Sequence, residues 1–225
     1  MQANYYLDLR IMDSADDGEL TLAHLRNQIY SILHGVFREI PNTFALALEI
    51  SPRQKAKMER KELKYKIPVS PQYDVLRIFA SEQSSLEQLI DKIKGHWKVR
   101  DYAILNTPTA VPTAKVTGYK SYFRFRIPTV KMERNVESKT QSRNAKRLKE
   151  AKNMPYFKVS SQTTGQGFTV NVEILNVDLS HPQYGLPKNY TDPNNVHVKD
   201  LNGLPDSYGL ARKQQAFALP VFEVI

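Results

Sequence analysis

The sequence has no cysteine among its 225 residues. Disulfide bonds, thiolate zinc sites and cysteine nucleophiles are therefore excluded. The sequence also lacks a run of about 18 apolar residues, which a membrane-spanning helix would need. Its first letters, MQANYYLDLRI, do not have the basic-then-apolar order of a secretory signal peptide. We therefore expect a cytoplasmic protein that does not enter a membrane.

Sequence patterns for binding metals or nucleotides are missing as well. No two histidines lie closer than ten residues apart, and no His-Glu-His grouping of the kind that holds a metal occurs. The GQG of residues 165–167 is too short for a dinucleotide fingerprint, and no GxxxxGKS or GxxxxGKT phosphate loop is present. We expect neither a metal nor a cofactor. The five histidines are His24, His34, His96, His181 and His197.

The positive charge is concentrated in one segment. The chain carries 32 Lys and Arg against 23 Asp and Glu, a net charge of +9. Residues 115–158 hold thirteen Lys and Arg and three Glu, a net charge of +10, so the rest of the chain has a net charge of −1. A localised basic stretch is typical of proteins that bind a polyanion. A solvated face is the alternative, but the aromatic residues interleaved with these charges favour the polyanion.

The first half of the chain has the pattern of a mixed helix and sheet unit. Apolar residues recur at helical spacing over 20–40 and 84–95. The order strand–helix–strand–strand–helix–strand is typical of a ferredoxin-like domain, a topology that hosts many functions. The basic segment 53–66 is interpreted as a mobile flap. Alternating apolar residues predict strands at 4–12, 43–50, 73–80 and 101–106.

A proline-containing linker at 106–115 separates this half from the next. We therefore predict an α+β fold, with a ferredoxin-like βαββαβ domain over residues 1–107. It is followed by an α/β half over residues 108–225, which carries a basic helix and a β-hairpin and binds RNA. The elements expected in this second half are a strand at 122–127, a helix at 134–153 and two strands at 156–161 and 168–175.

The letters SSQTTGQGF, residues 160–168, separate the two hairpin strands. The stretch is rich in hydroxyl and carboxamide groups, and its glycines expose backbone N–H groups that can face an oxyanion. It is equally consistent with a plain hairpin turn in which Gly165 takes a positive φ. Phe168 continues an alternating apolar face, so it is also consistent with a core position.

Basic and aromatic side chains in the second half suit RNA. Arg124 and Arg126 alternate with aromatic residues, an arrangement that favours stacking on bases and contacts to the backbone. His34, late in the first helix, is suited to proton transfer near neutral pH, although a boundary position in the helix explains it too. One face of the 134–153 helix offers phosphate contacts or a solvated surface. That face carries Lys139, Arg143, Lys146 and Arg147.

The residues together resemble the CRISPR-associated endoribonuclease of type I-F systems, which cuts precursor CRISPR RNA at its repeat hairpins. The histidine in SILHGVF is the first point of resemblance, and the turn SQTTGQGF is the second. The third is the C-terminal YGLARKQQAFALPVF. The strand and basic helix between these blocks are similar in type and order.

The resemblance implies a mechanism without metal, in which the 2′-hydroxyl of the RNA attacks and leaves a cyclic phosphate. It implies that His34 transfers a proton, that Ser161 holds the 2′-hydroxyl and that Tyr208 positions His34 or the substrate. The implied partners are the repeat hairpin, which forms the 3′ stem-loop of the mature crRNA, and the backbone subunits of the type I-F surveillance complex. The implied RNA contacts are Arg124 and Arg126 at the terminal base pair, Lys139, Arg143, Lys146 and Arg147 along the stem, Thr163 and Thr164 near the cut, and Phe168 at a base.

The sequence departs from this family in three places. Its basic helix contains more lysine than is usual, and lysine grips phosphate without the bidentate fork of arginine. Segments 53–66 and 176–205 have no counterpart that we can assign. A hairpin-binding subunit that has lost cleavage, and a structural RNA-associated protein, remain alternative functions. Tyr208 is also consistent with a buried aromatic.

Overall fold

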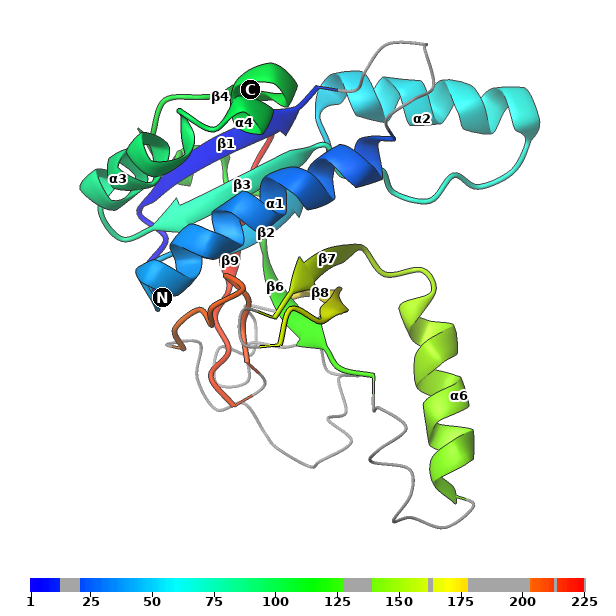
Figure 1. The fold of residues 1–225 in the computed structure, drawn as a ribbon. Helices are drawn as coiled ribbons and strands as arrows, with labels where there is room; N and C mark the ends of the chain where they lie inside the picture. Colours follow the sequence, from blue (N-terminus) through cyan, green and yellow to red (C-terminus); the bar gives the residue numbers. More distant parts are fainter. Residues whose placement is uncertain (13–20, 128–138, 162–163, 178–202, 213, 225) are drawn as a thin grey trace.

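A computed structural model describes residues 1–12, 21–127, 139–161, 164–177, 203–212 and 214–224. These residues form two antiparallel sheets with helices around them (Figure 1). Within this part of the chain, no helix is both long enough and apolar enough to span a bilayer.

The first sheet has the strand order β2-β3-β1-β4, and the short β5 also pairs with β1. In its centre Leu7 faces Ile78 and Leu9 faces Leu76 across β1 and β3. The helices α1 and α3 pack against this sheet and against each other. The strands are β1 (Tyr5–Ile11), β2 (Ala45–Glu49), β3 (Val75–Ala80), β4 (Ala103–Leu105) and β5 (Thr109–Ala110).

The predicted helices at 20–40 and 84–95 are confirmed as α1 (Leu22–Glu39) and α3 (Gln83–Ile93). The apolar residues of α1 that recur at helical spacing are buried in the core. Thr21 begins α1 as an N-cap, because its hydroxyl accepts a hydrogen bond from the backbone N–H of His24 at 3.2 Å. The strands of this half also form within a few residues of their predicted bounds.

The segment 53–66, interpreted as a mobile flap, forms the helix α2 (Pro52–Tyr65), which the sequence pattern did not reveal. Ser51 caps this helix, and Pro52 occupies its first turn, where a missing N–H costs nothing. The linker at 106–115 is also more ordered than expected, since it contains β5 and a 3₁₀ turn, η1 (Thr113–Lys115). A short helix, α4 (Trp97–Tyr102), precedes β4 where the strand was expected to begin.

The second sheet has the strand order β7-β8-β6-β9. The hairpin predicted around residues 160–168 is confirmed as β7 and β8, and β6 pairs with β8. The C-terminal β9 closes the other edge, a strand that the sequence pattern did not reveal. The strands are β6 (Gly118–Phe125), β7 (Tyr156–Ser160), β8 (Gly167–Asn176) and β9 (Leu219–Val221).

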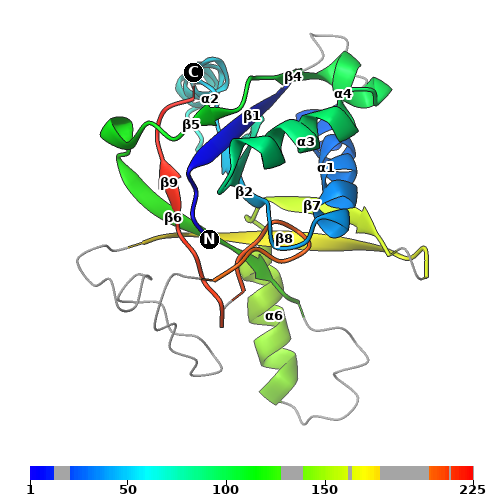
Figure 2. The same cartoon turned by 90° about the vertical axis from the view of Figure 1, so that its left-hand side faces the viewer.

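The predicted basic helix is present as α6 (Lys139–Ala151), while residues 134–138 lie outside the described part of the chain. Figures 1 and 2 both show α6 extending from the second sheet, away from the first. Because Leu148 is exposed, this helix contributes little apolar burial to the core.

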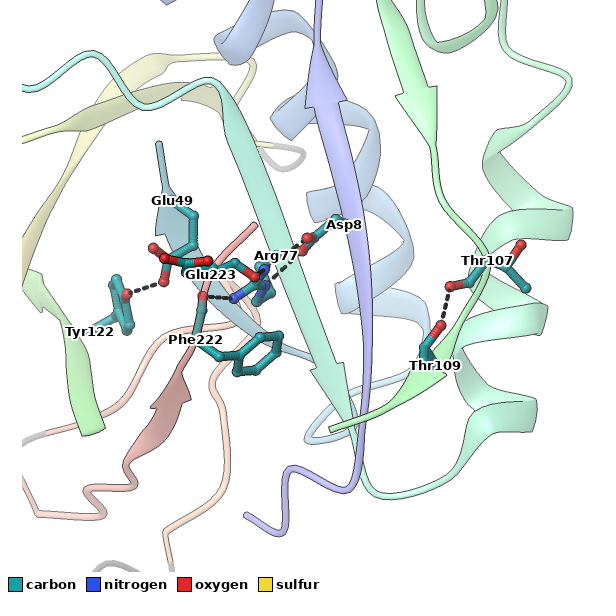
Figure 3. Close-up of polar contacts among 8 residues, drawn as sticks. All are labelled: Asp8, Glu49, Arg77, Thr107, Thr109, Tyr122, Phe222 and Glu223. Carbon is teal, nitrogen blue, oxygen red and sulfur yellow. Dashed lines mark hydrogen bonds and ion pairs between the residues drawn. The ribbon is translucent and has the colours of Figure 1, made fainter. Parts of the chain in front are cut away.

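The arginine of a buried ion pair in the first sheet also links the two halves of the chain. The Arg77 guanidinium donates to both carboxylate oxygens of Asp8, at 2.7 and 2.8 Å, and to the backbone carbonyl of Phe222 at 2.9 Å (Figure 3). The Phe222 ring lies 3.9 Å from the guanidinium carbon. Across the same junction, the Tyr122 hydroxyl donates to Glu49 at 3.4 Å (Figure 3). The C-terminal segment is thereby fixed to the first sheet.

Candidate active site

His34 lies on α1 at the junction between the first sheet and the C-terminal loop. Its imidazole ring stacks on the Tyr208 ring, with centroids 4.7 Å apart and planes inclined by 10°. Tyr30, one helical turn earlier, lies parallel to His34 at 6.0 Å and stacks on Phe157 of β7 at 3.7 Å. A stack of aromatic rings therefore connects the hairpin, α1 and the C-terminal loop.

Asp206 fixes the loop that carries Tyr208. Its Oδ1 accepts hydrogen bonds from the backbone N–H groups of Tyr208 and Leu210, at 2.9 and 3.0 Å. Gly209 takes a φ of 74°, and a Cβ at this position would lie 2.9 Å from the Phe37 ring. The Tyr30 hydroxyl donates to the Tyr208 carbonyl at 3.1 Å. These contacts define the backbone of Tyr208 and hence the place of its half-buried ring.

The electrostatic surroundings keep His34 neutral. The pKa of His34 falls from its ordinary 6.5 to about 4, first because the ring is buried and then because of the positive charges of Arg38 and Arg124. Only 7% of the residue is exposed. Its Nε2 is buried and has no hydrogen-bond partner among the described residues. A buried polar atom without a partner is costly, so this nitrogen is suited to a hydrogen bond with a bound ligand.

Arg124 and Phe168 complete the surroundings of Tyr208. The guanidinium carbon of Arg124, on β6, lies 4.5 Å from the centre of the Tyr208 ring and 5.7 Å from that of Phe168. Phe168, on β8, meets Tyr208 edge to face at 6.4 Å. Phe168 is partly exposed and packs against the core. Its ring is therefore part of the core and also lies at the edge of the site.

Ser161 begins the turn between β7 and β8. Its N–H donates to the Gln166 carbonyl at 2.9 Å, and its own carbonyl accepts from Gly165 at 2.8 Å. The Ser161 hydroxyl accepts a hydrogen bond from the N–H of Thr164 at 3.3 Å. Gly165 has a φ of 66°, as the turn interpretation predicted. The hydrogen bonds of Ser161 are therefore made within the turn itself.

The strand that follows this turn brings Phe168 to the site. Phe168 pairs with Val159 in the sheet, directly beside the turn, and its ring reaches Tyr208. Within the described residues, no hydrogen bond or ring contact joins Ser161 to His34. Thr164 is exposed, and Thr163 lies outside the described residues.

A basic cleft adjoins Arg124 on the side that faces α6. Arg147 of α6 crosses it, donating to the Arg126 carbonyl at 2.8 Å and covering the Phe125 ring at 5.3 Å. Lys146 is exposed, and the side chains of Lys139 and Arg143 lie outside the described part of the structure. The cleft measures about 270 Å³ and is lined by Arg124, Phe125, Arg126, Arg147, Asp206, Ala211, Arg212 and Gln214.

Sequence reasoning missed Asp206, Tyr30 and Arg212. Asp206 had a local signal, since an Asp two residues before a Tyr-Gly pair is typical of a turn in which the carboxylate accepts backbone N–H groups. Tyr30 and Arg212 had no local signal. The contacts of Tyr30 with His34 and Tyr208, and the place of Arg212 in the cleft, depend on segments that meet only in the folded chain. Within the described residues, no group of three or more His, Asp or Glu is placed to hold a metal ion.

The chain matches the model of a known protein family. The family described as CRISPR-associated protein (Cas_Csy4) matches residues 6–194. The matched range contains His34, Arg124 and the Ser161 turn, whereas Tyr208 lies beyond it. No curated protein matches the chain.

Proposed function

The chain belongs to the family of CRISPR-associated proteins described as Cas_Csy4, and from that membership we propose that it is a metal-independent endoribonuclease. The family points to a role in processing precursor CRISPR RNA. Our proposal adds that the cut falls at the 3′ base of the repeat hairpin and that the enzyme keeps the mature crRNA. The observation that carries it is the neutral His34, which lies beside a fixed tyrosine and whose buried Nε2 has no hydrogen-bond partner among the described residues.

The proposed reaction uses the RNA's own nucleophile. The 2′-oxygen forms a bond to the adjacent phosphorus, and the bond from phosphorus to the 5′-oxygen breaks. The 2′ proton passes to a base, and the leaving 5′-oxygen takes up a proton. The products are a 2′,3′-cyclic phosphate and a 5′-hydroxyl end. All atoms come from the RNA, and the protein supplies position, proton transfer and charge.

His34 is the proposed proton acceptor. A neutral imidazole has a free lone pair at neutral pH, and a positioned base of this kind contributes roughly 10²–10⁴-fold in rate. The parallel Tyr208 ring restricts rotation of the imidazole, so that Nε2 keeps one direction. Ser161 is proposed to hold the 2′-hydroxyl in line with the leaving oxygen, which contributes through orientation.

Arg124 is proposed to stabilise the charge of the transition state. Its guanidinium lies against Tyr208, close to the reacting imidazole, where it also opposes protonation of His34. A fixed cation beside a phosphate that gains negative charge lowers the barrier. Arg124 would thereby keep the base neutral and favour the charged intermediate.

Binding of the hairpin is proposed to use the basic cleft and α6. Arg124 and Arg126 would contact the terminal base pair, and Phe168 would stack on a base at the foot of the stem. Thr163 and Thr164 would contact the backbone near the cut. The proposed contacts along the stem are Lys139, Arg143, Lys146 and Arg147.

The proposal includes the setting of the enzyme. It would remain in the cytoplasm, bound to the crRNA stem-loop and to the backbone subunits of a type I-F surveillance complex. The strand order β2-β3-β1-β4, with α1 and α3 packed on the sheet, supports a ferredoxin-like unit over residues 1–107. Residues 108–225 would form the RNA-binding half.

Two observations favour a second candidate, a hairpin-binding subunit that has lost cleavage. No hydrogen bond joins Ser161 to His34 within the described residues, and a pKa of about 4 leaves His34 a poor general acid at neutral pH. RNA binding would then be the function of the same surface.

A cleavage assay in EDTA separates these candidates. A labelled repeat RNA should be cut at the 3′ foot of the hairpin, and the product should carry a cyclic phosphate. The same RNA with a 2′-deoxy nucleotide at the cut should bind equally well and stay intact. Tight binding of the unmodified RNA without any cut would favour the second candidate.

A further inference from the structure

The helix α2 extends from the first sheet as an exposed arm. Only Gln54 of its residues is buried, and every residue from Glu59 to Lys66 is exposed. Figure 1 shows the helix reaching beyond the ends of the strands. Such a helix gains little from packing on the core, and intrinsic helix stability over a length of this kind is marginal in water. Its formation therefore depends on how it is anchored.

The anchor of α2 is a buried carboxylate. Asp74 accepts a hydrogen bond from the N–H of Ser51 at 2.7 Å, and a second from the Ser51 hydroxyl. The same hydroxyl accepts from the N–H of Gln54, while the Asp74 carbonyl accepts from Ile11 of β1 at 2.7 Å. At the far end, the Glu62 carboxylate accepts from the N–H of Val69 at 3.0 Å. The arm is held at a fixed position on the sheet.

Four basic residues of α2 fall on one face. Arg53, Lys57, Arg60 and Lys64 follow one another at four, three and four residues, so they form a row about 16 Å long on one side of the helix. We call this row the basic stripe. The opposite face carries Lys55, Glu59 and Glu62, and Lys66 follows as the C-cap, so these four charges cancel.

The arm is a second basic segment, distinct from the one that includes α6. Residues 53–66 hold seven Lys and Arg and two Glu, a net charge of +5. Within the described residues, Arg53 and Arg60 make no ion pair, and Lys64 contacts only the ring of Tyr65, at 5.2 Å. These three side chains of the stripe are therefore not neutralised by carboxylates within the described part of the chain.

Apolar side chains are exposed at the tip beside these charges. Leu63 is 80% exposed, Tyr65 57% and Ile67 61%. Exposed aromatic and apolar surface among cations suits unpaired bases, which stack on such side chains while their phosphates meet the cations. A duplex would present its phosphates and leave this tip in water. The combination favours single-stranded RNA over a stem.

The arm is far enough from His34 to contact a different part of the RNA. Leu22, at the start of α1, lines a groove with Gln54 and Met58 of α2, whereas His34 lies about 18 Å further along α1. The retained RNA continues as single strand only from the 5′ foot of the hairpin, since the 3′ part leaves after the cut. We propose that the basic stripe binds the single strand on the 5′ side of the hairpin. This inference rests on the proposed function.

The experiment compares three RNAs that carry a 2′-deoxy nucleotide at the cut: the hairpin alone, the hairpin with a 5′ single-stranded extension, and the hairpin with a 3′ extension. The variant Arg60→Gln with Lys64→Gln removes two charges from the stripe. The matched control, Lys55→Gln with Lys66→Gln, removes one charge from the opposite face of the same helix and one at its C-cap. Circular dichroism checks that both variants keep their helix content.

The wild type and the control should bind the 5′-extended RNA more tightly than the hairpin alone. The affinity of the stripe variant for the 5′-extended RNA should be about tenfold lower near 0.15 M salt. The slope of log K against log salt should fall in magnitude by about 1.4, because the variant loses two single-strand phosphate contacts that contribute about 0.7 each. Its affinity for the hairpin alone should stay at the wild-type value.

Three results would overturn the inference: no benefit of the 5′ extension in the wild type, an equal loss in the control variant, or a benefit confined to the 3′ extension. The first is also the result expected if α2 binds a protein subunit. The proposed function fails separately, since it requires the 3′-extended hairpin with its natural 2′-hydroxyl to be cut by wild type and stripe variant alike.

Discussion

The ring of Tyr208 lies parallel to the imidazole of His34, 4.7 Å away, although the two residues come from opposite ends of the chain. The contact requires the C-terminal loop to return across α1. Three interactions hold the loop there. The Tyr30 hydroxyl donates a hydrogen bond to the Tyr208 carbonyl, and the Asp206 carboxylate accepts hydrogen bonds from backbone N–H groups of the loop. Gly209 also packs closely against the Phe37 ring. The histidine is thus placed by tertiary structure.

Removal of the imidazole should abolish cleavage and leave binding intact. In His34→Ala we expect the single-turnover rate to fall by roughly 10²–10⁴-fold, since the proton acceptor is lost. The dissociation constant for the 2′-deoxy hairpin should not change, because the basic cleft and α6 remain. Rate and affinity are measured on the same preparation. A variant that cuts at the wild-type rate would show that His34 has no catalytic role.

The pH dependence should reveal the lowered pKa of His34. The base form of the imidazole exists above the folded pKa, so kcat/KM should keep its histidine-dependent part down to pH 5 and lose it near the pKa of about 4. A histidine in water would lose its base form near 6.5. Arg38→Gln removes a charge that lowers this pKa and should move the acid limb upward. An acid limb near 6.5 in the wild type would contradict the buried, neutral histidine.

The same pKa affects stability. The folded pKa of His34 lies below its unfolded value, so the unfolded chain binds more protons between pH ~6.5 and ~4. The stabilisation from the neutral ring is complete above that window and is lost as the pH falls through it. In His34→Gln this part of the pH dependence of unfolding should disappear, which denaturant titrations at several pH values would detect.

Asp206 should act through Tyr208. Asp206→Ala leaves two backbone N–H groups without their acceptor, and a misplacement of the tyrosine by about 1 Å could cost about 10²-fold in kcat. Asp206→Asn keeps an oxygen at Oδ1 and should recover most of the rate. The dissociation constant for the 2′-deoxy hairpin should be similar in both variants. Equal loss of rate in the two would show that the charge, and not the acceptor, is required.

Much of the fold could be predicted from local pattern. The apolar residues of α1 and α3 recur at helical spacing, and the strands alternate, because each element buries one face. The helix α2 was missed since it buries almost nothing, and its anchor, Asp74, lies beyond the segment itself. The strand β9 was missed for a similar reason, as it forms only when the C-terminus reaches β6.

In the candidate site, too, contacts between distant segments could not be predicted from local sequence pattern. The sequence identified His34 and the Ser161 turn as separate features, and the resemblance connected them with Tyr208. No sequence spacing could give the stack of Tyr208 on His34 or the place of Arg124 over both aromatic rings, because these contacts depend on the meeting of α1, β6, β8 and the C-terminal loop. The Asp206 turn alone had a readable local signal.

The last prediction concerns the proposed contacts of α6 with the phosphates of the RNA stem. Arg147 stands between the helix and the cleft, with its guanidinium on the Arg126 carbonyl and over the Phe125 ring. Replacing Arg143 and Arg147 together by alanine should weaken hairpin binding and lower the salt slope by up to about 0.9 per lost phosphate contact. Arg147→Lys keeps the charge but loses the planar contact with Phe125, so it should retain the slope while losing affinity.

The matched control for this double variant is Lys149→Ala with Lys152→Ala, which removes two charges near the end of α6. If both pairs change the slope equally, the helix acts through its overall charge; if only the Arg143 and Arg147 pair does, a defined face meets the RNA. An unchanged slope in the arginine pair would contradict the proposed contact. Because cleavage chemistry depends on His34 and not on α6, the double variant should still cut saturating hairpin at close to the wild-type rate.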